Sequence, residues 1–384
     1  MSGRWHILAL LFAVRTTMAF QFQSVAALAP LIQKEFAVGL ADLGMLIGLY
    51  LAPGVALAVP GGDIGRRYGD KVVVLAGLGL MACGGLLMAC ASSWSLQIAG
   101  RLVAGTGGVL LNVLMAKMVA DWFAGKEIAT AMAIFVNSWP VGIALALLVL
   151  PVLGTTLGVS AAFALTAALV AVGLLALAAF YRAPPANGAA AATGARPSGA
   201  ALGAVLLSGL VWGLYNASFA MVFAFGPSLL AERGWSLTAA SSATSIVLWL
   251  VALSVPLGGW LADRSGRPGA ILVGGCLSSA VLLLFAARSE QVIAAFIGLG
   301  LVSGLAAGPI LALPARVLAP ATRASGMGIF FALFYVCVVL APWVAGLLAG
   351  AAGTVRVTFD FGAAMLVACC LVMLPYRRVA VSAS

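Results

Sequence analysis

Two arginines of this 384-residue chain lie inside long apolar runs. Arg15 interrupts the run from Trp5 to Ala29 near its middle, and Arg101 lies in the run of residues 95–120. At about 1.5 Å of rise per helical residue, Arg15 would lie near mid-depth of a membrane that this run crosses. An isolated arginine there costs from about 3 to more than 10 kcal/mol, so it must face protein, water or an anion. Because a guanidinium binds carboxylates and other oxyanions through paired hydrogen bonds, the chemistry that Arg15 predicts is anion recognition.

The acidic residues of the chain support this interpretation. No Asp or Glu lies deep in any apolar run, so the sequence offers Arg15 no carboxylate at its own depth. We therefore expect the substrate to supply the negative charge. The alternative is structural: Arg15 reaches the membrane interface, or pairs with backbone carbonyls or a helix end. For Arg101 we favour a gating or structural role, because glycines at spacings of four and seven residues let another helix approach that face closely.

The composition shows what must position these arginines. Apolar residues make up 64% of the chain and charged residues only 8%, whereas a soluble domain has about 25% charged residues. The chain is therefore predicted to be an all-α membrane protein, because barrel strands would alternate over about ten residues and these runs do not. Its six cysteines have no metal-type spacing, and its one histidine gives no metal site, so we expect no enzyme, no metal and no cofactor.

Twelve runs are long enough to cross a hydrocarbon layer of about 30 Å. They lie near residues 5–29, 42–62, 71–92, 95–120, 127–151, 159–181, 201–225, 238–262, 269–287, 290–316, 323–349 and 355–376.

The basic residues of the connections set the orientation. The chain has 20 Lys and Arg residues, of which Arg15 and Arg101 lie within spans. The others lie in alternate connections, fourteen on one side and four on the other, namely Lys34, Arg233, Arg288 and Arg356. By the positive-inside rule both termini are cytoplasmic, and the net charge of +10 reflects topology rather than nucleic-acid binding.

The chain also divides near its middle. Residues 183–200 are rich in Pro, Gly and Ala and predict a cytoplasmic linker between a bundle of residues 1–182 and a bundle of residues 201–384. Shifting the sequence by 197 residues aligns Pro30 with Pro227 and Glu35 with Glu232. Two related six-helix bundles predict a secondary transporter with its substrate site near mid-membrane between them.

The two halves predict walls of different chemistry. On a helical wheel, Phe22 and Gln23 share one side of the first span with Arg15, and the residue matching Arg15 at the 197-residue offset is Trp212. The candidate substrate-binding residues, by helical face and by their place at irregular points of the later spans, are Arg15, Phe22, Gln23, Asn137, Trp212, Tyr215, Asn216 and Tyr335.

Two loops carry a family resemblance. The segment from Gly62 to Lys71, with Arg66, Arg67 and Gly69, and its counterpart from Gly259 to Gly266, with Asp263 and Arg264, resemble the loop signature of the major facilitator superfamily. The second copy keeps the family's aspartate at Asp263, whereas Arg66 stands at that place in the first. The resemblance implies that these loops lock the cytoplasmic side by charge pairs to neighbouring helices. Arg101, with Gly105, Gly107 and Gly108, resembles a second motif of the family, which implies a part in proton handling or structural pairing. The residues expected to act in gating are Gly62, Arg66, Arg67, Gly69, Lys71, Arg101, Pro140, Gly259, Asp263, Arg264 and Gly266.

Three further segments resemble one group of this superfamily. Residues 14–17, 120–125 and 137–142, the last with Pro140 inside a span, are similar to bacterial permeases of the cyanate and nitrate type. The resemblance implies a monomeric transporter of the bacterial inner membrane that moves cyanate, nitrate, nitrite or a short carboxylate, together with protons or in exchange for a counter-anion. The alternative is a proton-coupled exporter of drugs or apolar metabolites, which would use the aromatic wall and keep Arg15 as a structural residue.

Overall fold

The computed structural model describes residues 3–58, 60–123, 127–184, 197, 199–319 and 322–382. Throughout this described part the regular elements are α-helices and two short 3₁₀ segments. Twelve helical segments in it are long and apolar enough to cross a membrane. The predicted all-α fold with twelve spans is thus confirmed. Because each span satisfies its own backbone hydrogen bonds, the apolar residues between the helix ends can face lipid without exposing backbone polar groups to it.

The helices fall into two compact units, which are described one at a time. Unit 1 comprises Met1–Gly39 and Leu46–Ala189, and unit 2 comprises Leu40–Met45 and Ala190–Ser384. Most of the predicted linker, residues 183–200, lies outside the described residues, and the predicted limits of the two bundles stay a prediction.

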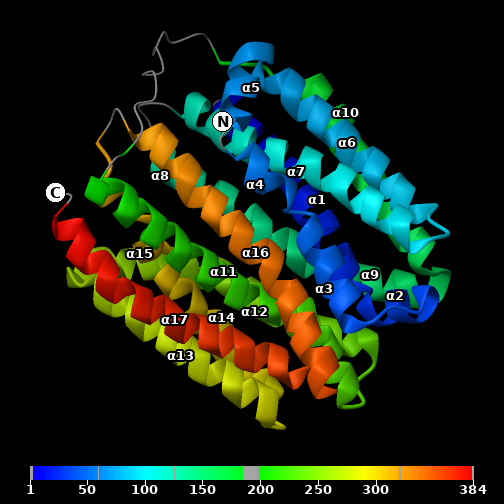
Figure 1. Cartoon of the computed structure of the whole chain (residues 1–384). Coiled ribbons are helices and arrows are strands. Elements are labelled where there is room, and N and C mark those ends of the chain that lie inside the picture. The colour runs from blue at the N-terminus through cyan, green and yellow to red at the C-terminus, as the bar shows by residue number, and fades with distance from the viewer. Residues whose placement is uncertain are drawn as a thin grey trace. The chain divides into compact units, whose positions relative to one another are not determined.

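Unit 1 is organised around α1 (Gly3–Ala27), which packs against α7, α9 and α10 (Figure 1). A second row consists of α6 packed between α7 and α10. The remaining helices of the first half are short pieces of spans or of connections. The bounds are α2 (Ala29–Phe36), α3 (Leu40–Leu49), α4 (Pro53–Leu57), α5 (Gly61–Tyr68), α6 (Asp70–Ala89), α7 (Trp94–Trp122), α8 (Ile128–Val136), α9 (Ser138–Leu157) and α10 (Val159–Phe180).

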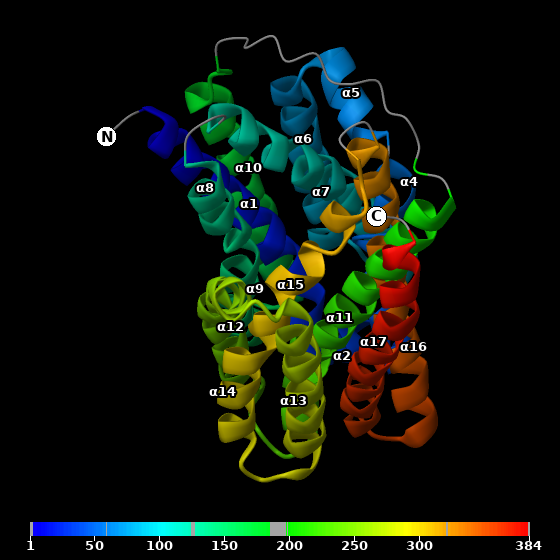
Figure 2. The same ribbon diagram turned by 90° about the vertical axis from the view of Figure 1, so that its left-hand side faces the viewer.

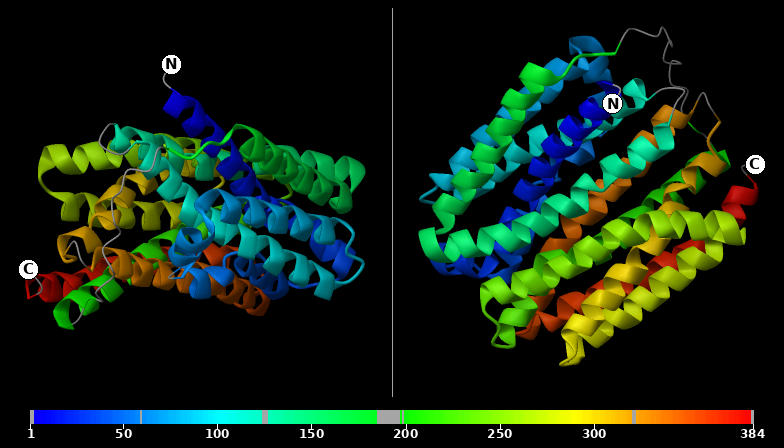
Figure 3. Two further views of the ribbon diagram at one scale, coloured as in Figure 1. Left: turned by 90° about the horizontal axis from the view of Figure 1, so that it is seen from above. Right: turned by 180° about the vertical axis from the view of Figure 1, so that it is seen from behind.

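Unit 2 is organised around α11 (Gly199–Glu232), which packs against α12, α16 and α17. Figure 2 shows α13 and α14 side by side, and Figure 3 shows the long helices of this unit running alongside one another. The bounds are α12 (Leu237–Ser265), α13 (Pro268–Arg288), α14 (Val292–Ser303), η1 (Gly304–Ala306), α15 (Ala307–Leu311), η2 (Pro314–Arg316), α16 (Arg323–Ala352) and α17 (Arg356–Val381).

The fifth and tenth spans are interrupted, as their prolines predict. The fifth divides at Asn137, between α8 and α9. The tenth divides into α14, η1, α15 and η2, and its first break comes at Gly304, earlier than Pro309 alone would indicate. Prolines remove a backbone donor and so leave carbonyls of the preceding turn without their usual partner. The freed carbonyls at the first of these breaks form part of the site described below.

The two similar loops share one backbone feature. Gly69 separates α5 from α6 with a φ of 85°, and Gly266 ends α12 with a φ of 62°. A side chain at either position would be strained, which explains why glycine recurs at the same 197-residue offset. The loop signature therefore marks a helix end at a glycine of positive φ in each half, although ψ is 132° at Gly69 and 10° at Gly266.

Candidate functional site

Arg15 is the centre of a polar cluster built from three helices of unit 1. Its Nε and Nη2 atoms both donate to Oδ1 of Asn112 on α7, at 3.1 and 3.0 Å. Its Nη1 atom donates to Ser138 Oγ at 3.0 Å and to the carbonyls of Phe135 and Val136 at 3.2 Å each. Each of these acceptors is neutral, and together they hold the guanidinium in one orientation. The side chain is half-buried.

The break in the fifth span supplies several of these acceptors. In an unbroken helix the N–H of residue 140 would bond the carbonyl of Val136, but Pro140 has no N–H. The freed carbonyl accepts from Arg15 instead. The C-terminal end of α8 also carries the negative end of its helix dipole, which favours a cation there. Pro140 thus shapes the environment of Arg15, a link that its prediction as a gating residue did not include.

The close approach of α9 to α1 brings this break within reach. A Cβ atom added at Gly142 would lie 2.5 Å from the carbonyl oxygen of Thr16 and 2.6 Å from Cβ of Ala19. Real Cβ atoms do not approach that closely, so a larger residue would push the two helices apart. The segment from Asn137 to Gly142 therefore combines a helix break, a hydroxyl acceptor and a contact point for α1.

Aromatic rings and an amide flank the guanidinium. Its carbon lies 4.8 Å from the ring centre of Phe135 and 5.8 Å from that of Trp139, within the range of cation–π attraction. The Phe22 ring contacts the Trp139 ring with ring centres 5.1 Å apart, and a role of Phe22 in substrate binding stays a prediction. Asn137, between two residues that bond Arg15, is half-buried, and its side-chain amide makes no hydrogen bond to another residue of the described part.

Gln23 takes a different position from Arg15, although both lie on α1. The side chain of Gln23 is fully buried, and Phe22 is 5% exposed. Direct contact of Gln23 with a substrate stays a prediction. Arg15 is thus half-buried, whereas the residues one and two turns beyond it on α1 belong to the interior of the unit.

Arg101 has a contrasting environment in the same unit. Its side chain is 0% exposed and donates to four backbone carbonyls: Gln21 (3.1 Å) and Phe22 (2.7 Å) on α1, and Leu46 (3.0 Å) and Ile47 (3.4 Å) on α3. The ring of Tyr50 lies 4.7 Å from its guanidinium carbon. Gly105, one turn along α7, makes room for the Tyr50 backbone, because an added Cβ would lie 2.1 Å from its carbonyl oxygen. Arg101 thus ties α1 and α3 to α7.

The aromatic wall predicted on the seventh span lies on α11 in unit 2, where rings of α16 join it. Trp212 stacks on Tyr215 with ring centres 5.6 Å apart and on Phe330 at 6.4 Å, and lies 6.2 Å from Phe334. Phe334 in turn contacts Tyr335, which is buried. Trp212 is half-buried, and its indole N–H makes no hydrogen bond to another described residue. Tyr215 and Phe330 are buried, so the half-buried rings of this cluster are those of Trp212 and Phe334.

Tyr215 and Asn216 are engaged within unit 2. The Tyr215 hydroxyl donates to the carbonyl of Ser303 at 2.7 Å, and the Asn216 amide donates to the carbonyl of Trp212 in its own helix at 2.8 Å. These hydrogen bonds direct Tyr215 toward α14 and turn Asn216 back on α11. A role of either residue in substrate binding stays a prediction.

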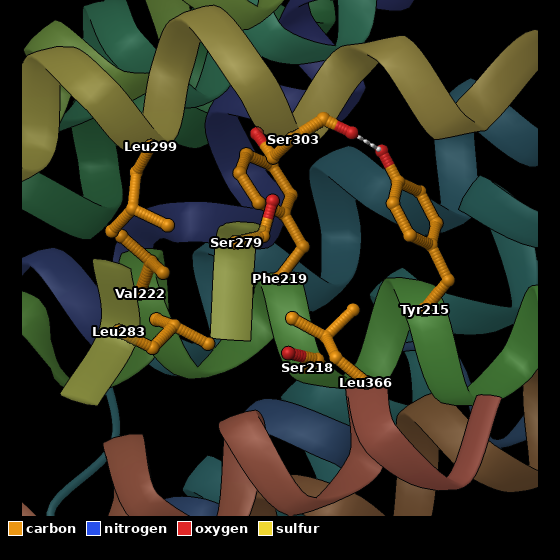
Figure 4. Close-up of a pocket in the computed structure, with 9 residues that line it drawn as sticks. All are labelled: Tyr215, Ser218, Phe219, Val222, Ser279, Leu283, Leu299, Ser303 and Leu366. Atoms are coloured by element: carbon orange, nitrogen blue, oxygen red, sulfur yellow. Dashed lines mark hydrogen bonds between the residues drawn. The ribbon is translucent and has the colours of Figure 1, made fainter. Parts of the chain in front are cut away.

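Tyr215 also borders a small cavity inside unit 2, shown in Figure 4. The space that the centre of a water molecule can occupy in it is about 10 Å³, which is room for about one water. Three serine hydroxyls at the cavity, on α11, α13 and α14, make no hydrogen bond to another described residue, and a water there would satisfy them. They belong to Ser218, Ser279 and Ser303.

The loop of the first half makes charge contacts within unit 1, and its part in gating stays a prediction. Lys117 on α7 forms ion pairs with Asp70, which follows Gly69, and with Asp121 at 3.0 Å. Lys71 donates to the carbonyls of Ala178 and Tyr181 at the end of α10. Arg67 lies over the Tyr68 ring at 5.4 Å. Gly62 and Arg66 belong to α5, but the side chain of Arg66 lies outside the described part.

The loop of the second half is arranged differently. Arg264 lies over the ring of Trp260 at 5.3 Å, and Asp263 is exposed and makes no ion pair with another residue that the structure describes. Gly259 lies within α12, where the backbone of Gly259 is 3.3 Å from a Cβ added at Gly308. The two copies of the motif therefore share a glycine of positive φ and differ in their charge contacts.

Sequence reasoning identified Arg15 but not the residues that hold it. Asn112, Phe135, Ser138 and Trp139 come from two other spans. Asn112 lies eleven residues after Arg101 and shares one face of α7 with it. This spacing was the available signal that the same face of α7 meets α1 at the level of Arg101 and at the level of Asn112. The proline after Ser138 was the signal for the freed carbonyl.

Comparison with known families identifies the architecture. The sequence matches the family model for the Major Facilitator Superfamily over residues 11–231 and again over residues 213–384. A segment of 133 residues is 28% identical to the inner membrane transport protein YajR of Escherichia coli K12, covering 34% of this chain and 29% of that protein. A segment of 83 residues is 34% identical to the probable glucose transporter rco-3 of Neurospora crassa, covering 21% of this chain and 14% of that protein. The matched regions thus span less than a third of these relatives' own lengths.

Solved structures show the same fold. A crystal structure of a bacterial homolog to the human lysosomal transporter Spinster, inward-facing and unoccupied, has a TM-score of 0.79 at 16% identity and covers 100% of this chain and 98% of its own. A mutant of the nucleoside transporter NupG has a TM-score of 0.74 at 16% identity, over 96% and 99% of the two chains. Identities this low speak for the fold alone. The finer resemblance to cyanate and nitrate permeases stays a prediction.

Proposed function

The chain belongs to the major facilitator superfamily and is a multi-pass secondary transporter, and we propose that its substrate is a small anion bound by Arg15. The observation that carries the proposal is the state of this guanidinium: it lies at the thirteenth of 25 residues of α1, half-buried, and neutral acceptors fix its direction. A cation oriented in advance binds an anion without first reorganising. The proposed substrates are cyanate, nitrate, nitrite or a short carboxylate.

The chemistry around Arg15 suits a small, flat anion. The guanidinium offers paired donors to planar oxyanions. The Trp139 ring and the side-chain amide of Asn137 are half-buried beside it, and these supply an apolar face and a hydrogen-bond donor. We place the transporter in a bacterial inner membrane with both termini cytoplasmic, as a monomer that moves its anion by alternating access, with a proton or in exchange for another anion.

A second candidate rests on unit 2. The half-buried ring of Trp212, which stacks on the buried rings of Tyr215 and Phe330, suits contact with an apolar or aromatic compound, as an exporter of drugs or metabolites would require. In that case Arg15 only braces α1 against α7 and α8. This is the structural alternative, and the carbonyl contacts of Arg15 are what it expects.

Uptake by proteoliposomes separates the two candidates. We expect purified protein to transport one or more of nitrate, nitrite, cyanate, formate and acetate, with Arg15→Ala at background and Arg15→Lys strongly reduced because lysine lacks the paired donors. Trp212→Leu tests the second candidate and should reduce anion uptake far less than Arg15→Ala does. Anion transport that survives both Arg15 substitutions, or efflux of apolar compounds that depends on Trp212 but not Arg15, would contradict the anion proposal.

A further inference from the structure

A second cavity of unit 2 lies among the start of α13, the α15–η2 segment and the end of α17. The space that the centre of a water molecule can occupy in it is about 70 Å³, several times what a single water requires. Buried side chains form its floor, with exposed fractions of 1% for Leu272, 3% for Met373 and 4% for Tyr376. The cavity therefore has room for a group larger than a water.

Two arginines, Arg316 on η2 and Arg377 on α17, line this cavity, and both are exposed. Neither makes a hydrogen bond or an ion pair with another residue in the described part of the chain, and none of the nine lining residues is acidic. The Tyr376 hydroxyl, by contrast, is occupied, because it donates to the carbonyl of Leu313 at 2.9 Å. The unused donors of the cavity thus all belong to cationic groups or to backbone.

The start of α13 adds positive potential at the same place. This 21-residue helix begins at Pro268, and no side chain caps its N-terminus. A Cβ added at Gly269 would lie 2.9 Å from Nη2 of Arg377, so that guanidinium rests against the first turn. A cation beside the positive end of a helix dipole is unfavourable on its own. A bound anion would offset this repulsion, because it attracts both the helix end and the two arginines.

The side of the membrane identifies the class of anion. Arg264, Arg267, Arg316, Arg377 and Arg378 all belong to the side that the positive-inside rule makes cytoplasmic. That leaflet is rich in anionic phospholipids, and basic pockets between helices at this level bind their head groups. The buried apolar floor would lie beneath such a head group.

We propose that the Arg316–Arg377 cavity binds a phosphate group at the cytoplasmic face of unit 2, independently of the anion site at Arg15. The chemistry is shared by two sources, the phosphodiester of an anionic phospholipid and a free phosphate ion. Binding by both arginines and the α13 terminus joins α13, η2 and α17 through one ligand.

Ligand-induced thermal shifts of the purified full chain in a neutral detergent test this site. Three probes are compared: dioctanoyl phosphatidylglycerol, dioctanoylglycerol with the same chains but no phosphate, and sodium phosphate. We expect the phosphatidylglycerol to raise the melting temperature saturably and dioctanoylglycerol to have no such effect. Stabilisation by phosphatidylglycerol alone identifies the lipid as the source, and stabilisation by sodium phosphate as well identifies a site open to the free ion.

The variants locate the binding. Arg316→Gln/Arg377→Gln should weaken the apparent affinity for phosphatidylglycerol by about tenfold or more, because charge-assisted paired hydrogen bonds are lost. The matched control Arg264→Gln/Arg378→Gln removes the same charge outside the cavity and should change the affinity little. If the double variant does not fold, Arg316→Gln and Arg377→Gln are each measured alone. Unchanged affinity in the cavity variants, equal weakening in the control, or equal stabilisation by dioctanoylglycerol would overturn the proposal.

Discussion

Arg15 and Arg101 are two intramembrane arginines of the same unit with different surroundings. Arg101 is fully buried and donates to four carbonyls on α1 and α3. Arg15 is half-buried and is held by an asparagine, a hydroxyl and two carbonyls at a helix break. The difference indicates that an arginine of a membrane helix can hold neighbouring helices together where each of its guanidinium nitrogens donates to a buried backbone carbonyl. We propose substrate binding for Arg15, which is half-buried and oriented by neutral acceptors.

The largest expected effect is on stability, in Arg101→Leu. This change leaves buried carbonyls of α1 and α3 without their donor and removes the link between them, at a cost of about 3 kcal/mol or more. We expect the purified variant to melt more than about 5 °C below the wild type, or not to fold. Fluorescence-monitored thermal unfolding and size-exclusion chromatography measure this. A variant that melts like the wild type would show that Arg101 is not a structural tie.

The matched change Arg15→Leu should have the opposite profile. Its acceptors are half-exposed or part of a helix end, so we expect the melting temperature to stay within about 3 °C of the wild type. Anion uptake should fall about 100-fold, because two charge-assisted hydrogen bonds to the substrate are lost. Uptake and melting temperature measured on the same preparation check both values. A loss of stability as large as that of Arg101→Leu would remove the distinction between the two arginines.

A smaller effect is expected for Pro140→Ala. Restoring an N–H at residue 140 lets the helix compete with Arg15 for the carbonyl of Val136, which loosens one of the contacts of the guanidinium. We expect the apparent KM for the transported anion to rise a few-fold, in line with one hydrogen bond worth about 1 kcal/mol, without loss of expression. The comparison variant is Pro151→Ala in the same span, which should leave KM unchanged. Equal effects of the two substitutions would contradict a specific link between Pro140 and Arg15.

Much of the architecture followed from sequence. Run lengths and composition predicted twelve spans, because lipid demands long continuous helices, and the structure has them. Depth along the first run identified Arg15 as a charge that needs an explanation. The exposure of Arg15 and the burial of Arg101 could not be predicted, because they depend on which helices approach each face. The contact of Arg15 with Asn112 joins residues 97 apart in the chain.

The contacts of the candidate residues show the same limit. The helical wheel placed Gln23 beside Arg15, whereas the structure buries Gln23 in the interior. Tyr215 and Asn216 lie on the predicted face of α11, yet they bond Ser303 and Trp212. A wheel gives the direction of a side chain from its own helix axis but not the neighbour it meets.

The most direct test of the central claim is anion binding by Asn112→Asp. The new carboxylate would keep the acceptor that holds Arg15 but cancel its charge, since an aspartate beside a guanidinium stays ionised at neutral pH. Nitrate, nitrite, cyanate, formate and acetate are titrated against wild type and variant by isothermal calorimetry, with Asn112→Gln as control. The account predicts that the anion bound by the wild type binds Asn112→Asp at least about tenfold more weakly, while the melting temperature is unchanged or higher. Unchanged anion affinity in Asn112→Asp would contradict it and leave Arg15 a structural residue.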